Sequence, residues 1–319
     1  MNPAAFFAQH PIIFHIIIIA ISFIILVKAA NLLVFGINRY AKKEGLSDYI
    51  IGLLVVSLTA STPEFVSSIS GLLAGDEGII FGTILGSNIA GITLVLGIFA
   101  LVGRKLKLDN KILKGMEPII FFLVMLPFIL GIDGSLSRID GVILIIVYFA
   151  YAAFLWIRES KTGHMKKDVK LKFVWKESLI FLLALAALFL SSRWLVFSAI
   201  TVSDMLNVPT FVMAIVVLGI ASSLPDIFVG IKSLLEGDTG VGIGGSLGSM
   251  IVKALLFFGL LAVIKPLPLD FSQLLISIII TIVSLLIVMY LTKTGKMTWK
   301  SGLVLLFVYI LYITLELIK

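Results

Sequence analysis

Glu64 lies inside the apolar run 51–73 and directly follows Pro63. A carboxylate in hydrocarbon is costly, so it indicates a functional site that faces a bundle interior or a water-filled cavity. Pro63 has no backbone N–H and therefore frees a carbonyl one turn earlier. Hydroxyl side chains surround the acid at Ser57, Thr59, Ser61, Thr62, Ser67 and Ser68. An interrupted helix with carbonyls, hydroxyls and a carboxylate suits a hard cation that prefers oxygen ligands.

A second acid follows a proline in the other half of the chain. Asp226 lies in the apolar run 211–234, and its offset from Glu64 is 226 − 64 = 162 residues. The same offset relates two pairs of serines, Ser61 with Ser223 and Ser87 with Ser249. One constant offset predicts an internal duplication. We expect a first repeat at 1–157 with a motif at 57–91, a linker at 158–176, and a second repeat at 177–319 with a motif at 219–253.

The composition is that of a polytopic membrane protein. Of the 319 residues, 60% are hydrophobic and 13% are charged, far from the balance of a soluble domain. The absence of cysteine excludes disulfides, thiol catalysis and thiolate metal sites. The glycine-rich stretch 242–248 lacks the Gly-Lys-Ser/Thr ending of a P-loop, so ATP-driven transport by this chain is not expected.

Ten apolar runs are long enough to be membrane helices. They are 12–36, 48–73, 79–102, 116–132, 138–157, 177–200, 209–234, 240–264, 270–291 and 300–317. Five spans per half is an odd number, so the second half must run inverted to the first. The predicted fold is therefore an all-α polytopic membrane protein with ten transmembrane helices as two inverted five-helix repeats. Such repeats are typical of secondary transporters, which bind substrate near the midplane.

Basic residues predict the orientation of these helices in the cell membrane. Nineteen Lys and Arg residues fall in or beside the loops on one side, and four fall on the other. The basic side is expected to be cytoplasmic, which places the linker 158–176 inside and both termini outside. This asymmetry also accounts for the net charge of +7 without a nucleic-acid partner. The first apolar run is long and lacks a cleavage site, so we interpret it as a retained span.

Lys253 is a basic residue in the middle of the span 240–264. About eleven residues separate it from either end of that span, which corresponds to roughly 16 Å of burial at 1.5 Å per residue. A lysine side chain cannot reach water over that distance, so it must pair inside the protein, and Glu64 and Asp226 are the expected partners. The alternative is a misplaced helix boundary. In the first repeat the equivalent residue is Gly91, which offers no ligand.

Each of these motifs also has a structural interpretation. A single buried acid can simply pair with a cation, and a serine beside glycine can simply hydrogen-bond to a neighbouring helix. Two acids at matching repeat positions favour the functional interpretation. We therefore expect Glu64 and Asp226 to form a two-carboxylate cage, and Ser87 and Ser249 to complete its oxygen shell.

The two motifs resemble the α-repeats of the cation/Ca²⁺ antiporter superfamily, and in particular those of prokaryotic sodium/calcium exchangers. In the first repeat the resemblance rests on Thr59-Ala60-Ser61-Thr62-Pro63-Glu64 and Gly86-Ser87-Asn88. In the second it rests on Ile220-Ala221-Ser222-Ser223-Leu224-Pro225-Asp226 and Gly248-Ser249-Met250. It covers nearly the whole chain, including the ten-helix layout, and implies alternating access by movement of helices one and six.

The resemblance also implies a role for each matching position. Glu64 and Asp226 match the acids that bind Ca²⁺. The hydroxyls that match cation-site ligands are Ser61, Ser223, Ser87, Ser249 and Ser222. Main-chain carbonyls at Ser57 and Gly219 match backbone ligands. The chain departs from the family at Gly91 and Lys253, where members commonly have Asn or Asp.

The resulting prediction is a secondary active antiporter that exchanges Ca²⁺ against Na⁺ or H⁺, with small inorganic cations and the lipid bilayer as its partners. No cofactor, nucleic acid or enzymatic activity is expected, and a monomer is compatible with the sequence. The alternative is a monovalent-cation or cation/H⁺ antiporter in which Lys253 substitutes for a bound cation. An intramembrane aspartyl-type hydrolase and a passive channel are retained as less favoured classes.

Overall fold

The computed structural model describes residues 10–43, 57, 61–107, 116–160, 175–220, 222, 223, 226, 227, 231, 234 and 239–319. The longer helices are α2 (Pro11–Lys43), α5 (Thr62–Ala74), α6 (Glu77–Ala90), α8 (Glu117–Leu130), α9 (Arg138–Ser160), α10 (Trp175–Leu206), α13 (Thr239–Ile251), α15 (Phe271–Thr294) and α16 (Trp299–Ile318). Shorter helices are α7 (Leu96–Gly103), α11 (Thr210–Met213), α14 (Phe258–Ile264) and the 3₁₀ turn η3 (Gly131–Asp133). Three π-helical segments are η2 (Gly91–Val95), η4 (Ala214–Gly219) and η5 (Val252–Phe257).

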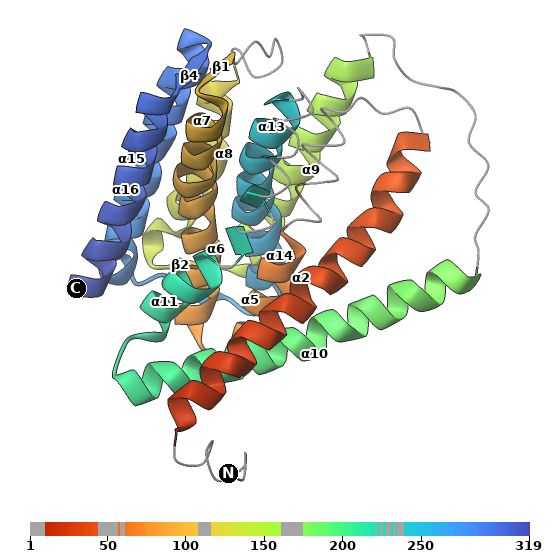
Figure 1. The fold of residues 1–319 in the computed structure, drawn as a ribbon, viewed down its shortest axis with the longest axis vertical. Coiled ribbons are helices and arrows are strands. Elements are labelled where there is room, and N and C mark those ends of the chain that lie inside the picture. The colour runs from red at the N-terminus through yellow and green to blue at the C-terminus, as the bar shows by residue number, and fades with distance from the viewer. Residues whose placement is uncertain are drawn as a thin grey trace.

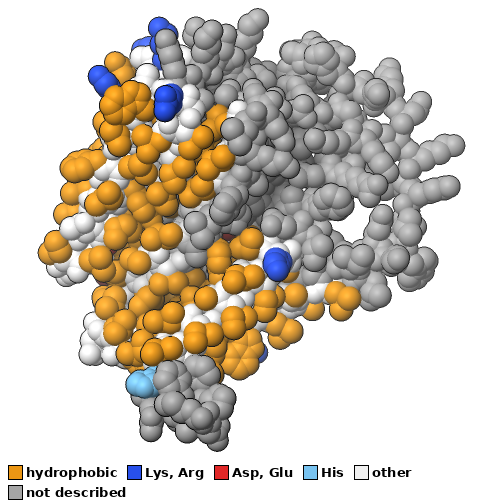
Figure 2. Space-filling view, in the orientation of Figure 1, with side chains coloured by type: hydrophobic (Ala, Val, Ile, Leu, Met, Phe, Trp, Pro, Cys, Tyr) orange, Lys and Arg blue, Asp and Glu red, His pale blue; other side chains and the backbone are white. Residues whose placement is uncertain are grey.

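These elements form a helical membrane protein with ten helices, as predicted. Six stretches of the described residues are each long and apolar enough to cross a membrane. The spans predicted at 48–73 and 209–234 are described only in part, and most of the linker 158–176 lies outside the described residues. Figure 2 shows a face on which hydrophobic side chains cover most of the described surface, with several Lys and Arg side chains at its upper edge. Such a surface is suited to lipid rather than water.

Two short strand pairs, which the sequence did not indicate, connect the repeats at opposite ends of the molecule. Strand β1 (Lys105–Lys107) pairs with β4 (Lys296–Thr298). Strand β2 (Ser135–Leu136) pairs with β3 (Leu267–Pro268). Each pair takes one strand from each half of the chain, and Figure 1 places β1 and β4 at the top and β2 well below them. Backbone groups in these loops are thereby satisfied outside the helices.

The second half of the chain is inverted relative to the first. Helix α7 leads into β1, and its repeat equivalent α14 leads into β3. Since β3 pairs with β2, these equivalent helices end at opposite ends of the molecule. The same symmetry relates the packing of α7 on α16 to that of α14 on α9. The inversion expected from the odd number of spans is therefore present in the fold.

Pairs of glycines bring the two halves into close contact. A Cβ on Gly302 of α16 would lie 2.7 Å from the carbonyl oxygen of Gly97 in α7. In the other half, a Cβ on Gly141 of α9 would lie 2.7 Å from the carbonyl oxygen of Gly259 in α14. Real Cβ atoms do not approach that closely, so these positions require glycine for the helix backbones to touch.

Helices α2 and α10 are the long first elements of the two repeats, with 33 and 32 residues. They pack against each other and run obliquely across the molecule in Figure 1. Their apolar contact includes Ile19 of α2 and Leu195 and Val196 of α10, which share a buried cluster with Leu218 of η4. The larger apolar core lies among the other helices. The pair of long helices therefore covers one side of the motif segments.

Candidate cation site

The first motif places Glu64 in the opening turn of α5. Ser61 is the N-cap, and Pro63 stands in the first turn, where its missing N–H removes no helical hydrogen bond. A helix start favours a negative charge, because its free N–H groups and dipole are positive. The Glu64 side chain is buried, with 3% of its surface exposed. The Ser57 carbonyl accepts the Ser61 N–H at 3.1 Å.

The structure describes the predicted positions of the second motif, from Gly219 to Lys253. The Gly219 carbonyl accepts the hydroxyls of Ser222 at 3.3 Å and Ser223 at 2.7 Å. Asp226 is half-buried. It is close enough to Glu64 and Lys253 to interact electrostatically with both. The two acids predicted from matching repeat positions therefore belong to one charged cluster.

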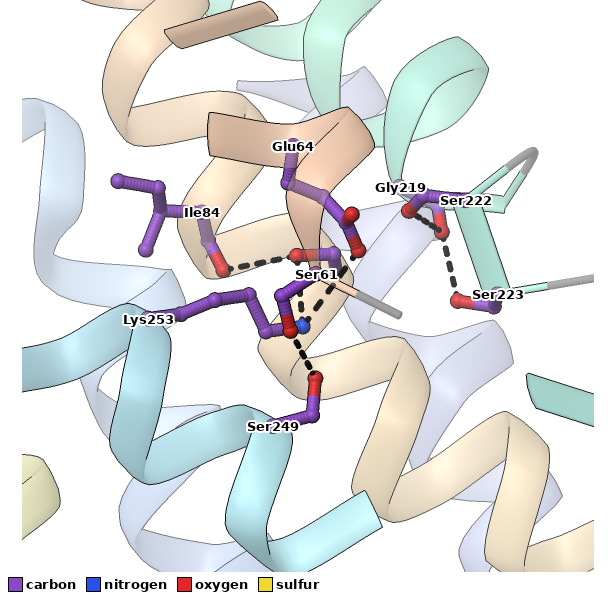
Figure 3. Close-up of polar contacts among 9 residues, drawn as sticks. Ser61, Glu64, Ile84, Gly219, Ser222, Ser223, Ser249 and Lys253 are labelled. Carbon is purple, nitrogen blue, oxygen red and sulfur yellow. Dashed lines mark hydrogen bonds and ion pairs between the residues drawn. The ribbon is translucent and has the colours of Figure 1, made fainter. Parts of the chain in front are cut away.

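Lys253 lies in η5 and points at Glu64 (Figure 3). Its Nζ is 3.8 Å from Glu64 Oε1 and donates a hydrogen bond of 3.0 Å to Ser87 Oγ. Ser87 Oγ in turn donates to the Ile84 carbonyl at 3.2 Å. Only 2% of the Lys253 surface is exposed. The prediction that this lysine is deeply buried and pairs with Glu64 is confirmed, and the alternative of a misplaced helix boundary is wrong.

The lysine breaks the symmetry of the two repeats. Ser61 Oγ and Ser249 Oγ share a hydrogen bond of 2.6 Å between α5 and α13. The equivalent residues, Ser223 and Ser87, are not joined in this way. Ser223 donates to Gly219, and Ser87 is held by Lys253. The Lys253 ammonium thus binds the Ser87 hydroxyl, which in a symmetric site would hydrogen-bond to Ser223.

Glycine and π-helical segments bring the motifs together. A Cβ on Gly219 would lie 3.0 Å from the carbonyl carbon of Gly86, so the two motif backbones are in contact there. The segments η2 and η5 begin at Gly91 and Val252, within one residue of equivalent positions in the two repeats. Such π-helical turns are frequent at functional sites. A Cβ added at Gly91 would meet nothing within 4 Å, although the residue is buried.

A small cavity of about 10 Å³ lies beside Glu64. Its polar lining comes from Glu64, Ser67, Thr83 and Ser222, and its apolar lining includes Phe23 and Leu26 of α2 and Leu195 of α10. Among the described residues, Glu64 Oε2 and Thr83 Oγ1 are buried with no hydrogen-bond partner. Buried oxygens without a donor cost free energy unless something else binds them. This cavity can therefore accept a cation on the side of Glu64 that faces away from Lys253.

Sequence reasoning missed Thr83 as a site residue. The signal was its position one helical turn before Ser87, on the same face of α6. Within the part of the chain that the structure describes, no three acidic, histidine or cysteine side chains gather as a metal cluster. A cation here would depend on two carboxylates together with hydroxyl and carbonyl oxygens, a ligand set suited to hard ions.

Similarity to known proteins extends over nearly the whole chain. The sodium/calcium exchanger protein family matches residues 14–157 and 176–318. The putative antiporter CaxA of Alkalimonas amylolytica is 25% identical over 93% of this chain and 96% of its own. The sodium/calcium exchanger MaX1 of Methanosarcina acetivorans is 24% identical over 93% of this chain and 97% of its own.

The fold is similar to that of the sodium-calcium exchanger NCX_Mj. A structure of that protein soaked with Na⁺ and Sr²⁺ superposes with a TM-score of 0.69 at 23% identity, covering 95% of this chain and 99% of the other. The resemblance of the two motifs to the cation/Ca²⁺ antiporter superfamily is confirmed. It places the chain among transporters rather than among enzymes such as intramembrane hydrolases. With both halves matched and the fold shared, the chain belongs to the sodium/calcium exchanger family.

Proposed function

We propose that this cation exchanger carries Ca²⁺ in exchange for Na⁺ or H⁺ by alternating access. The observation that carries the proposal is Glu64, a carboxylate buried at a helix start, whose Oε2 has no partner among the described residues and borders a cavity. Asp226 adds a second negative charge nearby. The printed names of MaX1 and NCX_Mj, which refer to sodium and calcium, support the choice of ions.

In this proposal the two acids provide the charge and the surrounding groups provide neutral oxygens. The neutral ligands are the hydroxyls of Ser61, Ser87, Ser222, Ser223 and Ser249 and the carbonyls of Ser57 and Gly219. Most of these hydroxyls are engaged in protein hydrogen bonds. A bound cation would turn them away from those partners, because a hydroxyl oxygen has two lone pairs and can rotate.

A monovalent-cation or cation/H⁺ antiporter is the second candidate, and the ion pair between Lys253 and Glu64 favours it. Two carboxylates alone would carry a formal charge of −2, and the ammonium reduces the cluster to −1. Ca²⁺ affinity rises with the number of charged ligands, so a fixed internal cation weakens divalent binding. Lys253 would then occupy the place of one monovalent ion in the transport cycle.

We also propose that the protein lies in the cell membrane with both termini outside. Support comes from the loops that hold β1 and β4, which are rich in basic residues and meet at one end of the molecule. A cytoplasmic location of that end agrees with the distribution of Lys and Arg in membrane proteins. We retain 1–157 and 177–319 as the repeats and 158–176 as the linker.

Uptake of radioactive Ca²⁺ into proteoliposomes, with outward Na⁺ and H⁺ gradients imposed separately, tests the proposal. We expect Ca²⁺ uptake that is driven by one of the two gradients and that is absent from the Glu64→Gln variant. Radioactive Na⁺ uptake that Ca²⁺ neither drives nor inhibits would instead select the monovalent antiporter. Uptake that needs no counter-ion would identify a passive channel and would contradict both candidates.

A further inference from the structure

A second buried acid lies between α15 and α16, on elements that contribute nothing to the candidate cation site. Glu316 stands in the last turn of α16, and its Oε1 accepts a hydrogen bond of 2.9 Å from Ser277 Oγ of α15. Ser277 also shares a hydrogen bond of 2.9 Å with Tyr312 Oη, one turn before Glu316. All three residues are buried, with exposures of 0% for Ser277 and Tyr312 and 2% for Glu316.

Nothing among the described residues pairs with the second carboxyl oxygen. Glu316 Oε2 is buried and accepts no hydrogen bond. Lys319 is the nearest basic residue in sequence and interacts with Glu316 electrostatically. Its ammonium is nevertheless occupied, because it donates to the carbonyls of Ser272 and Gln273 at the start of α15. An ionised Glu316 would thus lie among apolar and hydroxyl groups with only one hydrogen bond.

The surroundings favour a proton over a metal ion as the neutralising partner. In the described part of the chain, the side-chain oxygens hydrogen-bonded into this cluster are those of Ser277, Tyr312 and Glu316 itself. A hard cation commonly needs six or more oxygens. A buried ionised carboxylate costs far more than a neutral acid that lacks one hydrogen bond.

We propose that Glu316 is a proton-binding site, separate from the transported cation, that locks the hairpin of α15 and α16. A proton on Glu316 lets its O–H donate to Ser277, which can then donate to Tyr312. Loss of the proton leaves a charge between the two helices. The other titratable or charged groups that interact with Glu316 are Tyr312 of α16 and the ammonium of Lys319. Both helices of the hairpin also contact η2, which follows Ser87.

Because the folded protein holds this proton and the unfolded chain releases it, the stabilisation is present at low pH and is lost as the pH rises. The test combines chemical labelling with thermal unfolding of the full-length purified protein. A hydrophobic carbodiimide adds to a protonated carboxylic acid and not to a carboxylate, and mass spectrometry identifies the labelled residue. We expect modification of Glu316 at mildly acidic pH that falls about tenfold per pH unit above its midpoint.

Glu316→Gln keeps the shape and the neutral charge of the protonated acid, so the variant should fold. Its unfolding temperature should no longer decline as the pH rises through the midpoint of the labelling curve. The matched control is Glu77→Gln, which removes an acid that is 34% exposed and should retain the wild-type pH profile. Absence of label on Glu316 in wild type throughout the pH range would overturn the proposal. Identical pH profiles for wild type and Glu316→Gln would do so as well. Neither readout measures transport, so failure here leaves the proposed exchange intact.

Discussion

Glu64 has two carboxyl oxygens with different surroundings. Oε1 faces the Lys253 ammonium, and Oε2 borders the cavity with no hydrogen-bond partner among the described residues. Glu64 therefore contacts the fixed positive charge of Lys253 and also borders a cavity that can hold a transported cation. The competition between the two is the feature of this site that substitutions can test most directly.

Removal of either acid should abolish or severely reduce transport. Glu64→Gln and Asp226→Asn keep the size of the side chain but remove a charged ligand that water cannot replace in a closed site. Breaking a buried charge interaction costs about 3–5 kcal/mol, so we expect cation flux to fall by roughly 100-fold or more. Flux in proteoliposomes is the measurement, with Glu77→Gln as the control. Wild-type flux in both variants would refute the assignment of these acids.

Substitution of Lys253 should strengthen cation binding. In Lys253→Met the Glu64 carboxylate loses its ammonium partner, and a cation in solution becomes the only available replacement. The unfolding temperature should therefore rise more steeply with added Ca²⁺ or Na⁺ than in wild type, through binding to the folded state. Lys265→Met removes an exposed lysine and should leave this dependence unchanged. Equal cation dependence in Lys253→Met and wild type would place the lysine outside the binding equilibrium.

Thr83 should contribute an oxygen ligand from α6. Its buried hydroxyl faces the cavity without a partner among the described residues. Thr83→Val preserves the shape and removes the oxygen, and Thr83→Ser preserves the oxygen. We expect cation affinity to fall by about tenfold in the valine variant, the equivalent of one hydrogen bond to a charged group, and to stay near wild type in the serine variant. Binding measured by calorimetry that is equal in both variants would exclude Thr83.

At the scale of elements, the close contact of α7 with α16 depends on glycine. A Cβ on Gly302 would meet the Gly97 carbonyl oxygen at 2.7 Å and the Ala100 Cβ at 2.9 Å. Gly302→Ala should therefore separate the helices and destabilise the protein by about 1–3 kcal/mol. The control Gly245→Ala places its Cβ in open space within α13. The unfolding temperatures of the two variants in detergent are the measurement. Equal stability of Gly302→Ala and Gly245→Ala would show that α7 and α16 tolerate separation.

The whole molecule is held together by contacts exchanged between its two halves. Strand β1 of the first half pairs with β4 of the second, β3 of the second pairs with β2 of the first, and α2 packs against α10. The two buried apolar clusters accordingly each contain residues of both halves. The exchange also requires the predicted loops around β1 and β4 to lie on the same side of the membrane.

The orientation of the molecule can be tested with a single introduced thiol, since the natural chain has no cysteine. Thr162→Cys lies in the linker predicted to be cytoplasmic. Asp133→Cys lies in η3, just before β2 and so beside the strand pair at the other end of the molecule from β1. An impermeant thiol reagent should label the second variant in intact cells and the first only after lysis. Ready labelling of Thr162→Cys in intact cells would reverse the proposed topology.

Much of this architecture follows from the sequence by itself. The apolar runs predict ten helices because the bilayer sets a fixed length for a membrane span. The constant offset between Glu64 and Asp226 predicts the duplication, and the odd number of spans predicts the inversion. The depth of Lys253 along its helix predicts burial and a carboxylate partner. Each of these inferences depends only on position along the chain and on the cost of a charge in hydrocarbon.

Tertiary structure decided the features that depend on segments distant in sequence. Ser61 bonds to Ser249, whereas Lys253 holds Ser87, and no pattern within either motif distinguishes those partners. The cavity at Thr83 exists because α2 and α10 cover that side of Glu64. Glu316, near the end of a span, would be expected to reach water, yet Ser277 and Tyr312 enclose it. The approach of the helices decides which oxygens hydrogen-bond to each other and which remain free for a cation or a proton. The reason is that hydrogen bonds form only over a few ångströms.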